Sequence, residues 1–198
     1  DELHPVGVVS ALCPGGDGEP VNMAATTVIV GVLKLTFTAC LAFGTATATL
    51  VSQSLGEKDP EKASRFGWTS VKLGLVIFGV VGLTEAIFAE QLLGVVTKSD
   101  LVLEYALTPM RIMGLCTPLI AVGMILTQAL FGAGDTKFVM VAELILHFTC
   151  LVPLAYLLGV VLNYGLVGLW LSAVIYIAGL SVVMVLKFRG GGWKKIKL

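Results

Sequence analysis

Charged residues are scarce in this sequence. They make up 13% of its 198 residues, whereas a typical soluble domain has about 25%. The 13 basic and 13 acidic residues cancel, so no net field attracts nucleic acid. With 57% hydrophobic residues, the composition excludes an ordinary soluble domain and indicates a membrane protein.

Cysteines and catalytic motifs are equally sparse. Of four cysteines, Cys40, Cys116 and Cys150 lie inside apolar runs, where a thiol is a small buried hydrophobe and part of no disulfide framework. We find no cluster of metal ligands and no nucleophile with a paired base. The sequence therefore predicts neither an enzyme nor a resident cofactor.

The stretch ALFGAGDTKF, residues 129–138, resembles a phosphate-binding loop only superficially. Such a loop places Lys directly after its last Gly, at the start of a helix that follows a strand. Here Asp135 and Thr136 intervene, and the carboxylate would repel a phosphate. We interpret Gly132 and Gly134 as a helix C-cap and tight turn, and either Asp135 or Thr136 as the cap of the next helix.

Long apolar runs define the organisation, since about 20 apolar residues span a bilayer as a helix. Five segments qualify: residues 22–55, 66–89, 101–131, 137–162 and 165–187. Short links join them, namely residues 56–65, which begin at a turn with Gly56, and residues 91–100. The predicted fold is an all-α membrane bundle over 22–187, preceded by a polar, non-spanning segment (1–21) and followed by a basic tail (188–198).

The basic residues predict the orientation. Ten lie on one side: Lys58, Lys62, Arg65, Lys72, Lys137, Lys187, Arg189, Lys194, Lys195 and Lys197. The other side has Lys98 and Arg111. By the positive-inside rule the first side, with the C-terminus, is cytoplasmic in the plasma or inner membrane, with Trp193 at the headgroups. Five helices then require the chain to begin outside, and we interpret residues 1–21 either as part of a longer protein or as a short outer segment.

Ionisable side chains within apolar runs are candidates for function, because they are costly in a membrane. Glu143 and His147 lie four residues apart and share a helix face. They either bind a proton or cation, or form a structural pair. Lys34 either lines a cavity or extends to the headgroups. Glu85 and Glu90 are expected near the outer surface.

Gln53 and Gln128 are candidates for hydrogen bonds between helices, and the small residues 44–48 permit close helix contact.

Three motifs carry a family resemblance. ACLAFGTATATLVSQSLGEKDPEKASRFGW (39–68), ILTQALFGAGDTKF (125–138) and VPLAYLLGVVLNYGLVGLWLSAVI (152–175) occur in this order. Together they resemble one half of a multidrug and toxic compound extrusion (MATE) transporter, whose two six-helix lobes are pseudo-symmetric. The basic end of the chain is similar to that of a complete transporter, which implies helices eight to twelve, the C-terminal half.

The resemblance implies a mechanism and partners. Na⁺ or H⁺ entry would drive export of organic cations through a cavity shared with an N-terminal lobe, within membrane lipid. Met113 and Tyr156 are candidates for the cavity surface, although such residues also serve in packing. Two alternatives stay open: a lipid-linked sugar flippase of the same architecture, and a membrane fragment that transports nothing.

Overall fold

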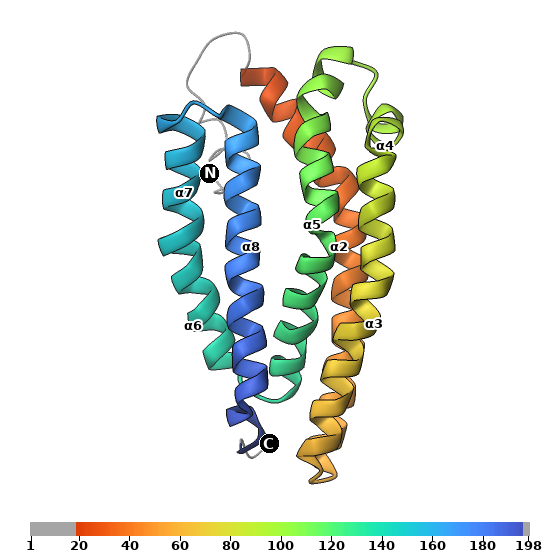
Figure 1. The fold of residues 1–198 in the computed structure, drawn as a ribbon, viewed down its shortest axis with the longest axis vertical. Coiled ribbons are helices and arrows are strands. Elements are labelled where there is room, and N and C mark those ends of the chain that lie inside the picture. Colours follow the sequence, from red (N-terminus) through yellow and green to blue (C-terminus); the bar gives the residue numbers. More distant parts are fainter. Residues whose placement is uncertain (1–18, 196–198) are drawn as a thin grey trace, which may run out of the picture.

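The structure, a computed structural model, describes residues 19–195, and these form helices with no strand among them (Figure 1). The α-helices are α2 (Glu19–Gly56), α3 (Pro60–Ile87), α4 (Ala89–Val96), α5 (Asp100–Gly132), α6 (Thr136–Leu146), α7 (Val152–Tyr156) and α8 (Gly165–Gly190). Two π-helical segments, His147–Leu151 and Leu157–Val161, extend α6 and α7 into one span, Thr136–Val161. The predicted all-α bundle is confirmed, with five helices long and apolar enough to cross a membrane. Most of the predicted segment 1–21 lies outside the described residues.

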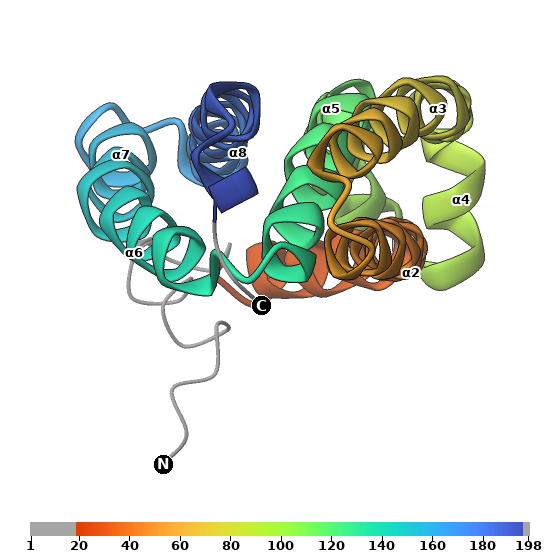
Figure 2. The same ribbon diagram turned by 90° about the horizontal axis from the view of Figure 1, so that it is seen from below.

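Helix α5 forms the centre of the bundle. It packs against α2, α3 and α8, while the α6–α7 span packs mainly against α8 (Figures 1 and 2). Because neighbours cover several of its faces, α5 is apolar around its circumference, and 61% of its most apolar stretch is buried, against 11–28% in the other four spans.

The core divides into two clusters along the bundle. One includes Ile125 and Leu130 of α5 with Phe188 of α8. The other includes Met110 of α5 and Ile29 of α2. Together the two clusters join α5 to its three long neighbours, α2, α3 and α8.

Small residues bring the helices close together, as predicted for residues 44–48. A Cβ at Gly132 would lie 2.3 Å from the carbonyl oxygen of Ala48, so only glycine permits α2 to approach here. This corrects the interpretation of Gly132 as a C-cap, because it is the last residue of α5 and Ala133 is the cap. Gly134 has φ +80° and takes the predicted tight turn.

Two segments predicted as links between helices are partly helical, so these predictions were wrong. Residues 56–65 contain the first turns of α3, which begins at Pro60 because the Asp59 side chain accepts a hydrogen bond from the Lys62 amide at 2.9 Å. The left-handed residue of this turn is Lys58 (φ +61°), not Gly56. Residues 91–100 include most of α4, whose Ala89 and Leu93 are buried.

Trp193, which the sequence predicts at the level of the headgroups, is enclosed by protein. Its ring is fully buried and stacks on Phe188 at 4.7 Å, and its Nε1 donates to the Phe188 carbonyl at 2.8 Å. Nearby, Lys194 pairs with Glu61 at 2.8 Å. The start of the basic tail therefore folds back against α3.

Candidate functional site

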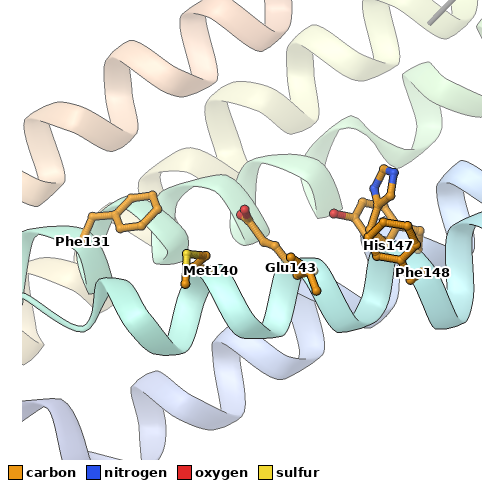
Figure 3. A pocket seen from close by; sticks show the side chains of 7 residues that line it. Phe131, Met140, Glu143, His147 and Phe148 are labelled. Carbon is orange, nitrogen blue, oxygen red and sulfur yellow. The ribbon is translucent and has the colours of Figure 1, made fainter. Parts of the chain in front are cut away.

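A pocket of about 450 Å³ opens beside the α6–α7 span (Figure 3). Its lining comes from the end of α5, from α6 and the π-helical segment after it, and from α8. The lining residues are Phe131, Met140, Glu143, Leu144, His147, Phe148 and Tyr176. Apolar and aromatic side chains thus surround one carboxylate and one imidazole.

Glu143 and His147 both contribute to this pocket, as their shared helix face predicts. Their side chains project to the same side of the helix (Figure 3). Glu143 is half-buried and His147 is exposed. The His147 ring lies edge-on to Tyr176 at 5.9 Å and to Phe148 at 5.8 Å. No hydrogen bond or ion pair joins the side chain of Glu143 to another residue of the described chain, so its carboxylate has no partner there.

Local backbone geometry shapes this region. His147 begins a π-helical segment, and a second follows Tyr156. Pro153 lies between them and has no amide hydrogen, which interrupts regular α-helical bonding. Pro153 therefore lies between two wider helical turns, and the first of these contributes His147 and Phe148 to the pocket.

The other sequence candidates do not join this site. Lys34 and Gln53 are exposed on α2, and Tyr156 is exposed on α7. Met113 is only 1% exposed and belongs to the core. Neither it nor Tyr156 lines the pocket.

The predicted glutamine hydrogen bonds between helices are not found within residues 19–195. The side chain of Gln128 instead packs over Gly44, where a Cβ would lie 2.8 Å from Gln128 Cγ. Gln53 is in the last turn of α2 and faces away from its neighbours. A glutamine side chain can pack through its apolar stem or form hydrogen bonds through its amide group. The sequence does not show which of these roles a given glutamine has.

Asp135 occupies the N-cap position of α6 but makes no capping hydrogen bond with its side chain. Its carboxylate pairs with Lys187 of α8 at 2.9 Å, and the Lys187 ammonium lies 4.1 Å from the centre of the Phe138 ring. The turn predicted to be structural thus connects α5 and α6 to the end of α8.

Glu85 is the residue that sequence reasoning placed wrongly. It was expected near the outer surface, but it is 6% exposed. Thr36 of α2 donates to its Oε1 and Thr117 of α5 donates to its Oε2, the latter at 3.1 Å. One sequence signal was available, since Glu85 stands in an apolar run that contains no other charge between Lys72 and Glu90. Among the residues described, no three His, Cys, Asp or Glu side chains form a group that could hold a metal ion.

Comparison with known proteins gives one consistent result. The MatE family matches residues 9–164. The chain is 28% identical over 169 residues to the "Probable multidrug resistance protein NorM" of Thermotoga maritima, over 84% of this chain and 36% of that protein. It is 27% identical over 152 residues to "Protein DETOXIFICATION 29" of Arabidopsis thaliana, over 76% of this chain and 30% of that protein.

Solved structures share the fold. The eukaryotic MATE transporter AtDTX14 superimposes with a TM-score of 0.86 at 19% identity, over 96% of this chain and 42% of that one. The MATE transporter ClbM in complex with Rb⁺ gives 0.83 at 23%, over 96% of this chain and 44% of that one. The chain spans about a third of the length of the two curated relatives.

Proposed function

Because the chain belongs to the MatE family, we propose that it forms one lobe of a secondary transporter that exports organic cations in exchange for Na⁺ or H⁺. The family is one of transporters rather than enzymes, and the chain is a multi-pass membrane protein. The family match over residues 9–164 is the observation that carries this proposal.

The pocket beside α6 supports a role in cation transport. Phe131, Phe148 and Tyr176 give it an aromatic surface that attracts organic cations. The carboxylate of Glu143 supplies negative charge at its centre, without a basic partner among the residues described. We propose Glu143 as the residue that binds the coupling ion here, with His147 beside it as a second titratable group.

A complete transporter requires a second lobe. The chain spans about a third of the curated relatives named above, and the resemblance of its motifs and basic end favours the C-terminal half. We propose an N-terminal lobe as its partner, with the C-terminus on the cytoplasmic side of the cell membrane. The substrate cavity would then lie between the two lobes.

The test is ion-driven export of a fluorescent cationic dye by a complete two-lobe transporter that carries these helices, reconstituted in vesicles. An imposed Na⁺ or H⁺ gradient should drive dye transport without ATP. Glu143→Gln should slow this transport about tenfold or more, which corresponds to an increase of about 1.4 kcal/mol in the activation free energy, while protein yield and membrane insertion stay normal.

The matched control is Lys137→Gln in the first turn of α6, an exposed charge on the same helix as Glu143. It should transport at the unmodified rate. Dye export that requires ATP, or that no ion gradient drives, would contradict the proposed function. Unchanged ion dependence in Glu143→Gln would instead assign coupling to another carboxylate.

A further inference from the structure

Glu85 lies level with the central turns of two longer helices. It is in the last turn of α3, but its partner Thr36 is 17 residues from the start of α2 and 20 from its end. These separations are about 25 and 30 Å along the helix. Thr117 is similarly central in α5, 17 residues from Asp100 and 15 from Gly132. Glu85 therefore lies at the junction of three helices, far from both ends of α2 and α5.

The helices enclose this carboxylate tightly. Thr36 is 8% exposed, Thr117 is fully buried and Glu85 is 6% exposed. One turn before Glu85, a Cβ at Gly82 would lie 2.3 Å from the carbonyl oxygen of Gly114 and 2.7 Å from Thr117 Cβ. The backbones of α3 and α5 thus hold Glu85 and Thr117 together.

Hydrogen bonding at this cluster is complete in both protonation states of Glu85. The single hydroxyl proton of Thr117 is within reach of two acceptors, Glu85 Oε2 and the Met113 carbonyl oxygen, each at 3.1 Å. With Glu85 ionised, Thr117 donates to the carboxylate. With a proton on Oε2, the carboxyl group donates to Thr117 Oγ1, and the Thr117 hydroxyl turns to Met113. Thr36 donates to Oε1 in either state.

No basic side chain neutralises Glu85 within the described part of the chain. The neighbouring titratable group is Cys40 of α2, within electrostatic range of Glu85. Among the side chains that the structure describes, the other charged or titratable ones on α2, α4 and α5 are Lys34 (α2), Glu90 (α4) and Asp100, Glu104, Tyr105, Arg111 and Cys116 (α5). All of these are exposed except Cys116, which is half-buried. The side-chain partners of Glu85 are therefore two hydroxyl groups and no cation.

We propose that Glu85, Thr36 and Thr117 form a proton-binding site, separate from the pocket that contains Glu143. Uptake of a proton neutralises the carboxylate, and the Thr117 hydroxyl rotates to accept the new hydrogen bond. Because the three residues come from α2, α3 and α5, the charge of Glu85 affects the packing of all three. Its use in coupling rests on the proposed transport function, whereas binding of the proton does not.

Infrared difference spectroscopy tests the binding directly, through the carbonyl stretch of a protonated carboxyl group. The complete transporter in lipid nanodiscs is titrated with pH. Beside the bands of the other carboxyl groups, the unmodified protein should show a titrating carboxyl band that is absent from the spectrum of Glu85→Gln. Glu90→Gln, which removes an exposed carboxylate from the adjacent helix, and Glu143→Gln should both retain it. Thr117→Val keeps the carboxylate and should shift the band, because a hydrogen bond is lost.

The titration is repeated with choline in place of Na⁺, and its midpoint should not move. A carboxyl difference spectrum that Glu85→Gln leaves unchanged, or a midpoint of the Glu85 band that depends on Na⁺, would overturn the proposal. Should Glu85→Gln fold poorly, the unshifted band of a folded Thr117→Val would overturn it equally.

Binding of the cationic dye at acidic and neutral pH provides a separate result on coupling. In the unmodified transporter the two affinities should differ at least about fivefold, and Glu85→Gln should remove this difference. If the unmodified protein binds no dye while the band still titrates, the proposed function fails and the proton site stands. If dye binding depends on pH equally in both proteins, the link between Glu85 and coupling fails.

Discussion

At the scale of single residues, two glycines of α3 show how packing sets what each position tolerates. They are three residues apart in the same helix. A Cβ at Gly82 would collide with the backbone of α5, whereas a Cβ at Gly79 would meet nothing within 4 Å. Both glycines look alike in the sequence, but only Gly82 lies in a helix contact.

This difference predicts opposite effects of one substitution. Gly82→Ala should lower the stability of the bundle by about 1–3 kcal/mol, as overpacking of a close contact does. Gly79→Ala should leave stability unchanged or raise it by up to about 1 kcal/mol, since alanine favours a helix over glycine. Thermal unfolding in detergent micelles, followed by circular dichroism, measures both. Equal effects of the two variants would contradict the close approach of α3 to α5.

At the scale of elements, the turn between α5 and α6 is held by α8. Asp135 and Lys187 form an ion pair that is largely shielded from solvent. Only 13% of the Asp135 side chain and 28% of the Lys187 side chain are exposed. The pair connects the start of α6 to the last turns of α8, and the Phe138 ring covers the ammonium group. Such a pair is shielded from solvent better than an ordinary surface pair.

A double-mutant cycle tests this connection. Asp135→Asn and Lys187→Gln should each destabilise the bundle, and the double variant should be more stable than the sum of the two effects predicts, by about 0.5–1 kcal/mol. Urea unfolding in mixed micelles gives the three free energies. The exposed pair of Lys62 with Glu57, at 2.7 Å, is the matched control and should couple more weakly. Strictly additive effects of Asp135 and Lys187 would show that the turn is held by packing alone.

At the scale of the whole molecule, the basic residues gather at one end. The α2–α3 turn, the α5–α6 turn and the C-terminal end of the chain lie at the same end of the bundle, opposite α4 (Figure 1). Seven of the ten basic residues counted on this side in the sequence lie in or next to these regions: Lys58, Lys62, Arg65, Lys137, Lys187, Arg189 and Lys194. The fold therefore agrees with a two-sided arrangement of charge along the membrane normal.

The side that faces the cytoplasm can be measured by cysteine labelling. In a complete transporter with the four native cysteines of this chain replaced by alanine, Lys195→Cys should be protected from an impermeant maleimide in intact cells, because its end carries the basic residues. Ser99→Cys, in the link before α5, should be labelled from outside. Permeabilised cells should label both. The reverse pattern would invert the proposed orientation.

The sequence determined the membrane class, the five spans and the family. Length and hydropathy suffice for the class and the spans, because a helix must satisfy its own backbone hydrogen bonds in lipid, and three sequence motifs indicated the family. The sequence also placed Glu143 and His147 on one face, since their spacing of four residues is a local property of the helix. Helix boundaries were less accurate where a short polar sequence folds locally, as Asp59 and Pro60 do at the start of α3.

Only the tertiary structure decided which polar side chains are enclosed. Glu85 is near the end of its own helix, and its burial follows from the greater length of α2 and α5 and from the close approach at Gly82 and Gly114. Trp193 is buried because Phe188 and its carbonyl lie beside it. Whether a helix crosses a membrane depends on consecutive residues, and hydropathy along the sequence measures these directly. The burial of a side chain depends on residues that are distant in the chain, and hydropathy along the sequence does not report them.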